Sequence, residues 1–204
     1  WTATPAVADP AGYSYQWQRC TLDGTYCQNI VGATNSTYTL VAADSGSRIR
    51  VEVTATNAWA PDGVAYSEQT DEVLQAPVND TLPSISGPEA VAQELTADPG
   101  DWTSNPALTS GDYSYQWQTC DVTGTYCNDI VGADESTYEL QPSDYEQYIR
   151  VKVTASNGVS PDADAFSALS GQIEGQPPVN DTLPTISGDL EVGETLTADP
   201  GTWT

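Results

Sequence analysis

Tyr13-Ser-Tyr-Gln-Trp-Gln-Arg-Cys20 is the stretch that decides the fold of this 204-residue chain, and it returns almost unchanged as Tyr113-Ser-Tyr-Gln-Trp-Gln-Thr-Cys120. In both copies aromatic residues alternate with serine and glutamine, which is the two-residue period of a β-strand. A strand with this pattern presents its aromatic side chains on one face. We therefore predict that the aromatic face of each copy packs against a hydrophobic core.

A second cysteine follows each copy of this strand, Cys27 after Cys20 and Cys127 after Cys120. A glycine near the middle of each intervening segment indicates a turn, so we predict two hairpins, each closed by a disulfide. Cys20 and Trp17 differ in parity, and the disulfide is therefore expected on the outer face, away from the aromatic core. On the chain-entropy model so short a loop stabilises by about 2.5 kcal/mol. Disulfides also indicate an oxidising, extracellular compartment.

Zinc binding is the alternative use of four cysteines. Zinc ligand pairs usually lie about two to four residues apart, and this chain has no histidine. The two cysteine pairs also belong to different copies of the repeated sequence. We therefore favour disulfides and predict no zinc site.

The internal repeat covers most of the chain, with matching segments one hundred residues apart. Residues 29–33 match 129–133, 36–40 match 136–140, and 49–57 match 149–157. In the last segment isoleucine and valines alternate with charged or polar residues, as in a strand with one buried face. The two strand patterns together predict eight core residues: Tyr15, Trp17, Val51, Val53, Tyr115, Trp117, Val151 and Val153.

Proline-rich segments at 75–83 and 175–184 separate the repeated units. Proline blocks continuation of a strand, so we predict that both are semi-rigid linkers. A pair of short strands is expected after each linker. No helical periodicity of useful length appears, and turn residues recur about every ten positions, which indicates an all-β fold of antiparallel sandwiches.

Several motifs recur in these units: Pro-x-Ile-Ser-Gly, Leu-Thr-Ala-x-Pro-Gly-x-Trp, Tyr-x-Tyr-Gln-Trp-Gln-x-Cys and Ile-Arg-Val-x-Val-Thr-Ala-x-Asn. Together they resemble the tandem immunoglobulin-like repeats of large bacterial cell-surface proteins. The resemblance implies tandem Ig-like or fibronectin III-like antiparallel β-sandwiches joined by Pro-rich linkers. It also implies a role as a stalk, fibre or adhesin shaft without enzyme activity. A resemblance of this kind does not identify a ligand, because a fold does not fix a function.

The phase of the repeat predicts the domain boundaries. Residues 1–77 (repeat 1) form an Ig-like repeat that lacks its first two strands, and residues 78–176 (repeat 2) form a complete one. Residues 177–204 form a linker and the first two strands of a further repeat. Without methionine or a leader, the sequence is expected to be a processed product or part of a longer protein.

An unpaired sheet edge and an open aromatic core are disfavoured in water. We therefore expect residues 179–204 of one copy to complete the 1–77 module of the next. Two routes remain open, a continuous chain of tandem repeats and strand addition between separate chains. Either route gives a linear, head-to-tail extracellular filament at a cell surface. The residues predicted to contact the next copy are Trp1, Ile186, Leu196 and Trp203.

Charge narrows the possible partners. The chain has 29 acidic and 5 basic residues and a net charge of −24, which argues against nucleic acid or an anionic membrane. No apolar run is long enough to cross a membrane. The acidic surface is explained by solubility, and the alternatives are calcium binding or a saline habitat. Calcium would bind at the linkers, at Asp80 and Asp181, and no other cofactor is expected.

Other features give weaker signals. Catalysis finds little support, because the chain lacks histidine, its cysteines are paired and no Gly-x-Ser-x-Gly motif occurs. The basic residues lie in predicted strands and are expected to pair with carboxylates, although a docking surface is the alternative. An adhesin stalk, or a glycan-binding module using Trp59, is the alternative function. The glycosylation candidates are the sequon asparagines Asn35, Asn79 and Asn180.

Overall fold

The computed structural model describes residues 12–57 and 61–204, which belong to two compact units. One unit contains the described residues up to Leu82 together with Gly100–Ser114 and Val153–Ala165. The other contains Pro83–Pro99, Tyr115–Lys152 and Phe166–Thr204. The described residues contain no α-helix, and their regular structure is antiparallel strands with three single-turn 3₁₀ helices. The all-β class predicted from the sequence is confirmed.

Repeat 1 forms one four-stranded antiparallel sheet with the order β2-β1-β3-β4. Its strands are β1 (Tyr13–Cys20), β2 (Cys27–Asn29), β3 (Arg48–Ala55) and β4 (Gly63–Tyr66). The aromatic strand and the valine-rich strand are neighbours, with Trp17 opposite Val51. A 3₁₀ turn, η1 (Ala42–Asp44), precedes β3. The alternating pattern of each strand therefore places aromatic and aliphatic side chains on the same face of the sheet.

Repeat 2 forms the same sheet and adds a second one. The first sheet has the order β10-β9-β12-β13, and the second has the order β11-β7-β6. The strands of the first are β9 (Tyr113–Cys120), β10 (Cys127–Asp129), β12 (Tyr148–Ala155) and β13 (Ala163–Phe166). The strands of the second are β6 (Ser84–Ser86), β7 (Glu94–Asp98) and β11 (Thr137–Glu139). The 3₁₀ turns are η2 (Ser110–Asp112) and η3 (Pro142–Asp144).

The core of repeat 2 lies between these two sheets. Trp117 of β9 is fully buried and stacks on Tyr138 of β11, with ring centroids 5.7 Å apart. Leu95 of β7 and Val151 of β12 are also fully buried. Of these seven strands in chain order, the first, second and fifth form one sheet and the others form the second, as in an immunoglobulin-like sandwich.

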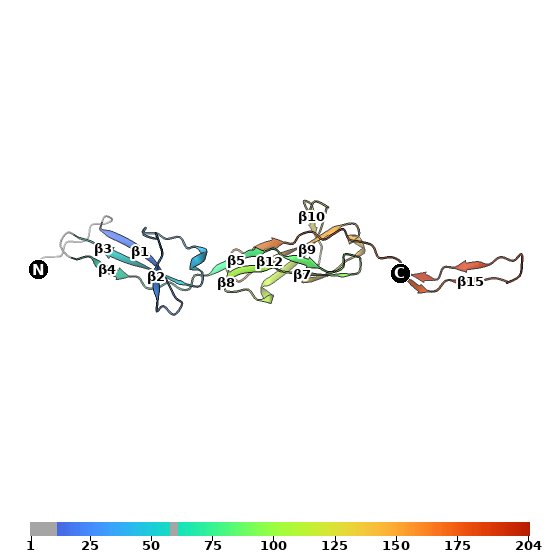
Figure 1. Ribbon diagram of the computed structural model, residues 1–204, viewed down its shortest axis with the longest axis horizontal. Helices are drawn as coiled ribbons and strands as arrows, with labels where there is room; N and C mark the ends of the chain where they lie inside the picture. Colours follow the sequence, from blue (N-terminus) through green and yellow to red (C-terminus); the bar gives the residue numbers. More distant parts are fainter. Residues whose placement is uncertain (1–11, 58–60) are drawn as a thin grey trace. The chain divides into compact units, whose positions relative to one another are not determined.

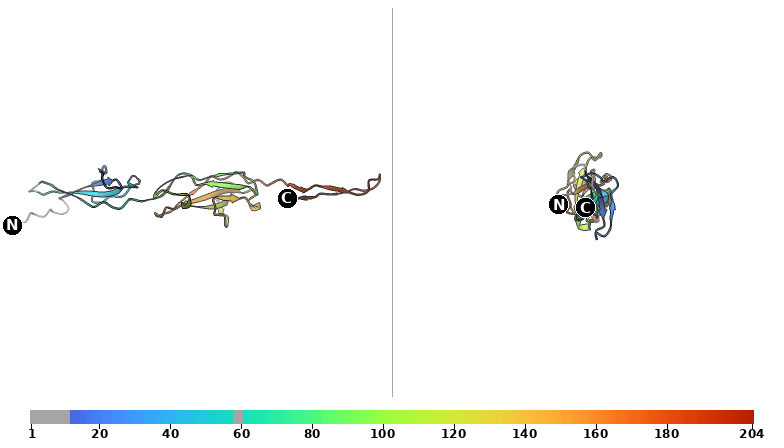
Figure 2. Two further views of the ribbon diagram at one scale, coloured as in Figure 1. Left: turned by 90° about the horizontal axis from the view of Figure 1, so that it is seen from below. Right: turned by 90° about the vertical axis from the view of Figure 1, so that its left-hand side faces the viewer.

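Three two-stranded ribbons complete the described structure (Figures 1 and 2). Strand β5 (Gln75–Thr81) pairs with β8 (Asp101–Asn105), and β14 (Asn180–Thr182) pairs with β17 (Thr202–Trp203). Strand β15 (Thr185–Ser187) pairs with β16 (Thr197–Asp199). We refer to residues 185–199 as the C-terminal hairpin, drawn in red in Figure 1.

The linker predicted at 75–83 differs from the structure, because residues 75–81 form the paired strand β5. Pro77 lacks a backbone donor, and the pairing with β8 is irregular between Gln75 and Val78, which accommodates it. The Asn157 amide also donates to the Gln75 carbonyl, at 2.8 Å. A proline in an irregular edge pairing therefore does not prevent a strand.

Candidate assembly interface

Repeat 1 has an open apolar groove on the face that the second sheet covers in repeat 2. The groove has a volume of about 470 Å³. Its floor belongs to the aromatic and valine-rich strands, and its walls are the segments before β3 and after β4. The lining residues are Trp17, Tyr38, Leu40, Ile49, Thr70, Asp71, Glu72, Val73 and Leu74.

Equivalent residues of the two repeats differ in burial because of this groove. Leu140 is 1% exposed, whereas its counterpart Leu40 is 53% exposed. Trp117 is fully buried, whereas Trp17 is only partly buried. The segment equivalent to β11 forms no strand in repeat 1, because the partner strand β7 has no counterpart among its described residues. The groove is therefore an unpaired apolar face of an otherwise similar sheet.

Part of the backbone around the groove, at Leu40 and Leu74, is also unpaired. In repeat 2 the Leu140 N–H donates to the Gln93 carbonyl, and the Leu140 carbonyl accepts from Ala92, both at 2.8 Å. The Glu174 N–H donates to the carbonyl of Glu89 at 2.8 Å. Within residues 12–57 and 61–82, the equivalent Leu40 and Leu74 have no backbone hydrogen bonds. Both walls of the groove therefore present free donors and acceptors to a strand.

The C-terminal hairpin is the sequence counterpart of the hairpin β6–β7 that fills this face in repeat 2. Leu196 corresponds to Leu95, and Ile186 corresponds to Ile85. Leu95 is fully buried, whereas Leu196 is 49% exposed and Ile186 is 73% exposed. The hairpin thus has the apolar residues of a core strand, and in this structure they face solvent.

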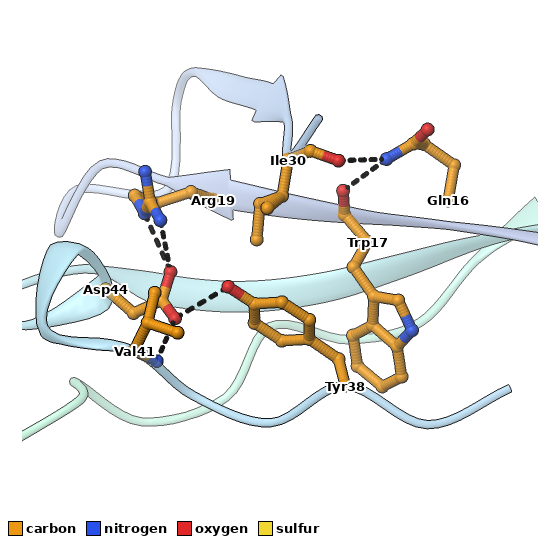
Figure 3. A network of polar contacts seen from close by, with 7 residues as sticks. All are labelled: Gln16, Trp17, Arg19, Ile30, Tyr38, Val41 and Asp44. Carbon is orange, nitrogen blue, oxygen red and sulfur yellow. Dashed lines mark hydrogen bonds and ion pairs between the residues drawn. The ribbon is translucent and has the colours of Figure 1, made fainter. Parts of the chain in front are cut away.

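A polar network fixes the floor of the groove (Figure 3). Trp17 stacks on Tyr38 with ring centroids 5.8 Å apart. The Tyr38 hydroxyl and the Val41 N–H both donate to Asp44 Oδ2, each at 2.8 Å, and Arg19 Nε donates to Oδ1 at 2.9 Å. Asp44 is completely buried. The aromatic floor is therefore held in place by a satisfied buried carboxylate.

Two pKa shifts follow from these contacts. Burial opposes ionisation of Asp44, but the Val41 N–H, the Arg19 guanidinium and the Tyr38 hydroxyl outweigh it and hold the pKa of Asp44 below its ordinary value. Burial and the neighbouring Asp44 carboxylate raise the pKa of Tyr38. Around neutral pH the pair is thus a carboxylate accepting from a neutral phenol. Sequence reasoning missed this pair, although Tyr138 and Asp144 recur at the same spacing in repeat 2.

Both expected disulfides are present, between Cys20 and Cys27 and between Cys120 and Cys127. Cys20 lies opposite Cys27 in the strand register, on the face of β1 away from Trp17 as its parity predicts. Cys20 is nevertheless 1% exposed, so this face is covered locally. Gln69 lies beside the disulfide, and its amide donates to the Gly24 carbonyl at 3.0 Å.

The other predicted core residues lie on the expected strands. Val151 and Val153 are fully buried, whereas Val51 and Val53 are partly buried, as the open groove requires. Tyr15 and Tyr115 are both partly buried. Of the predicted contacts with the next copy, Ile186 and Leu196 lie on the exposed hairpin, Trp203 on β17 is 54% exposed, and Trp1 lies outside the described residues.

The calcium candidates show no ligand cluster. Among the described residues, no group of three or more acidic, cysteine or histidine side chains could hold a metal ion. Asp80 accepts from the Thr103 hydroxyl at 2.6 Å, and Asp181 accepts from the Thr204 hydroxyl at 3.3 Å. These two carboxylates thus take part in pairing β5 with β8 and β14 with β17.

The three sequon asparagines have different environments. Asn79 donates to the carbonyls of Thr81 and Asp101, and Asn180 makes the equivalent pair of bonds. Asn35 is exposed, and its carbonyl accepts from the Trp17 indole at 2.9 Å. Only the Asn35 side chain is therefore open to a glycan without loss of ribbon contacts. The glycan-binding candidate Trp59 lies outside the described residues.

The basic residues make a range of contacts. Arg19 pairs with a carboxylate, but its partner Asp44 is buried in the turn η1 and does not lie on the outer face of a neighbouring strand, where we expected it. Arg50 and Arg150 instead lie over the rings of Tyr66 and Phe166, at 4.4 and 4.5 Å from the ring centroids. Each also donates to a glutamine side chain on the neighbouring strand. Cation–π stacking therefore replaces the predicted carboxylate pairing at these two positions.

Comparison with known proteins adds little to the fold class, which the order of the strands in the two sheets defines. No protein-family model matches the sequence, and no curated protein is significantly similar to it. Among solved structures, the amphioxus IgVJ-C2 molecule has 16% identity over 84% of this chain and 92% of its own length. The FN1–FN3 domains of chicken CNTN1 have 15% identity over 93% of this chain and 75% of their length. Both have a TM-score of 0.30, so the assignment to an immunoglobulin-like sandwich rests on the strand order.

Two findings bear on localisation. The two disulfides are consistent with an extracellular protein. No helix among the described residues is long and apolar enough to cross a membrane.

Proposed function

We propose that this chain is a structural segment of an extracellular filament or surface fibre built from head-to-tail Ig-like repeats. In this proposal the segment 179–204 of one copy completes the 1–77 module of the next copy. The chain has no enzymatic role, and its partner is a further copy of itself at a cell surface. The acidic surface keeps the fibre soluble and repels polyanions.

One observation carries the proposal: the chain has both an empty site and the element that fills the equivalent site elsewhere in the same chain. Hairpin β6–β7 covers repeat 2, and its homologue, the C-terminal hairpin, exposes the matching residues. Burial of one aliphatic side chain such as Leu196 contributes about 1.5–3 kcal/mol. Backbone pairing along both groove walls adds to this by strand addition.

The geometry of the two surfaces determines the form of the assembly. The groove lies in repeat 1 and the hairpin follows repeat 2, so the contact joins two different surfaces. Such a heterologous contact leaves one free groove and one free hairpin at the two ends of every oligomer. The product is therefore a linear polymer unless the rotation happens to close a ring.

The proposal is tested with the full chain and two matched variants. Leu196→Asp places a charge where the counterpart Leu95 is fully buried, and should abolish concentration-dependent assembly in sedimentation velocity and electron microscopy. Leu183→Asp is the control, because its counterpart Leu82 stays 64% exposed beside a docked hairpin. This variant should assemble like wild type. Equal assembly of both variants would refute the proposed contact.

Mixing two blocked variants tests the head-to-tail arrangement. Leu196→Asp leaves the groove intact, whereas Leu40→Asp blocks the groove and leaves the hairpin intact. Each alone should be monomeric, and an equimolar mixture should form 1:1 dimers and nothing longer. Dimers of either variant alone would show that the contact is not heterologous.

The mass of denatured, reduced native material separates the two routes of assembly. A species near 21.7 kDa indicates strand exchange between separate chains. A much larger species indicates that the next copy follows on the same polypeptide. Both results are compatible with hairpin completion of repeat 1.

A further inference from the structure

We infer that the C-terminal hairpin is matched to the groove of repeat 1 in a second copy, where Leu190 faces Asp71, and discriminates against the groove of repeat 2, where Glu191 would face Glu174. This inference rests on the proposed function and identifies which groove the hairpin selects. The facing positions of the filled groove and their counterparts in the open groove differ in charge.

The filled groove of repeat 2 has a close polar contact at its edge. The Gly171 N–H donates to Glu89 Oε1 at 2.8 Å. A Cβ added at position 171 would lie 2.3 Å from Glu89 Oε2. A side chain at position 171 would therefore displace the Glu89 carboxylate and break its hydrogen bond to the backbone N–H.

Both members of this pair differ at the open site. In repeat 1 the residue equivalent to Gly171 is Asp71, and in the C-terminal hairpin the residue equivalent to Glu89 is Leu190. Docking of a Glu89-type hairpin on repeat 1 would therefore place two carboxylates opposite each other, and the one on the hairpin could not keep the position that Glu89 has in repeat 2. Leu190 removes one of those charges. It is 89% exposed in this structure, so any apolar contact that it makes with repeat 1 is also favourable.

The adjacent facing pair also has one carboxylate, but here the groove of repeat 2 provides it and the hairpin does not. Ala90 is bridged in parallel to Glu174 in repeat 2. Their counterparts are Glu191 in the hairpin and Leu74 in the groove of repeat 1. When hairpin β6–β7 lies on repeat 2, or the C-terminal hairpin on repeat 1, each facing pair thus contains one carboxylate. The C-terminal hairpin on repeat 2 would instead oppose Glu191 to Glu174, and like charges directly opposite each other on paired strands are destabilising.

This pattern of charges selects the order of the filament. The hairpin of one copy recognises the first repeat of the next and does not displace β6–β7 from repeat 2. Copies consequently join in a fixed alternation of the two repeat types. The discrimination comes from repulsion in the wrong pairing, in addition to apolar contact in the right one.

The test uses full chains that differ at the facing pair. Leu190→Glu should weaken the association constant about 10–100-fold, whereas the uncharged Leu190→Gln should weaken it less. The double variant Leu190→Glu with Asp71→Gly recreates the pair seen in repeat 2 and should restore assembly to at least the Leu190→Gln level. Added salt should reduce the defect of Leu190→Glu and leave the double variant unchanged.

The possible outcomes separate this inference from the proposed function. If wild type assembles and Leu190→Glu matches Leu190→Gln with no rescue by Asp71→Gly, the selectivity is wrong and the filament proposal stands. If wild type stays monomeric at every concentration, both are overturned. A photo-crosslinker in place of Val192 should capture the peptide around Leu74 of a second copy. Capture of the peptide around Glu174 would overturn the assignment to repeat 1.

Discussion

Repeats 1 and 2 have the same four-stranded sheet, the same disulfide hairpin and the same tyrosine–aspartate contact, yet only repeat 2 has a closed core. Tyr138 donates to Asp144 at 2.7 Å, as Tyr38 donates to Asp44 at 2.8 Å. The valines of β12 are fully buried, whereas those of β3 are partly exposed. The difference lies in the second sheet: hairpin β6–β7 has no counterpart in the described part of repeat 1, and the segment equivalent to β11 forms no strand there.

This comparison shows that the larger sheet forms its register without the smaller one. Tyr13–Cys20 pairs with Arg48–Ala55 at all eight positions although the opposite face is open. Cross-strand pairs, the disulfide and the Asp44 network are sufficient to specify these strands. The hairpin then contributes burial rather than register, and so it can be supplied from elsewhere.

The largest expected difference between the repeats is in the effect of truncating the equivalent leucines. Leu140→Ala should destabilise repeat 2 by about 2–5 kcal/mol, because Leu140 is 1% exposed. Leu40→Ala should change the free energy of unfolding of repeat 1 in the unassembled chain by less than about 0.5–1 kcal/mol, since the side chain is half exposed. Native-state hydrogen exchange reports each repeat separately through matched amides. The Val51 and Val151 N–H groups donate to Ser67 and Ser167 hydroxyls, both at 3.0 Å.

The same two amides also give a prediction for assembly. In the unassembled chain the Val51 amide should exchange faster than the Val151 amide. Assembly should slow exchange of the Val51 amide more than exchange of the Val151 amide. Leu196→Asp chains serve as the unassembled control. Equal protection of the two amides before assembly would contradict an open core in repeat 1.

A smaller difference concerns the residue that faces the buried aspartate. Arg19 pairs with Asp44, whereas the equivalent residue beside Asp144 is Thr119. Arg19→Thr should destabilise repeat 1 by about 1 kcal/mol at pH 7, a modest value because a third of the Arg19 side chain is exposed. Thr119→Arg should stabilise repeat 2 by a similar or smaller amount.

The pH dependence of Arg19→Thr has a defined sign. The pKa of Asp44 is lowered from 3.8, so its contribution to stability is complete above about that pH. The contribution is lost as the pH falls through the lowered pKa. The difference in free energy of unfolding between Arg19→Thr and wild type, measured by denaturant titration, should therefore be constant from pH 7 to about 5 and shrink in stronger acid. A difference that grows in acid would contradict the role assigned to the pair.

The sequence predicts the strands of this fold well where their pattern has a period of two. The alternation around Trp17 and around Val51 indicates both strands and their buried faces, and the spacing from Cys20 to Cys27 indicates the hairpin. The offset between Trp102 and Trp203 also indicates that the C-terminal hairpin repeats the start of repeat 2. These features depend on neighbouring residues or on the internal repeat, so they can be predicted from one sequence.

The remaining features depend on contacts between segments. Strand β5 contains Pro77, so its pattern indicates a linker, and its pairing with β8 is visible only in the structure. The contact of Gln69 with the disulfide hairpin, at the Gly24 carbonyl, joins residues 45 positions apart. The match of Leu190 to Asp71 requires knowing that Glu89 contacts Gly171, which are 82 residues apart. Spacing within the sequence does not indicate such a pair.

The smallest expected effect is a change in the titration of Tyr38 on assembly. Burial and Asp144 raise the pKa of Tyr138 further than the pKa of Tyr38 is raised in the open groove. A docked hairpin buries Tyr38 in the same way, so assembly should raise the pKa of Tyr38 toward that of Tyr138. By linkage, the association constant should be insensitive to this group below pH 10 and fall as the pH rises through the raised pKa. NMR of ¹³C-labelled tyrosine, with Tyr38→Phe to assign the signal and Leu196→Asp as the unassembled reference, measures the shift. If Tyr38 titrates identically in assembled wild type and in Leu196→Asp, the hairpin does not cover the groove.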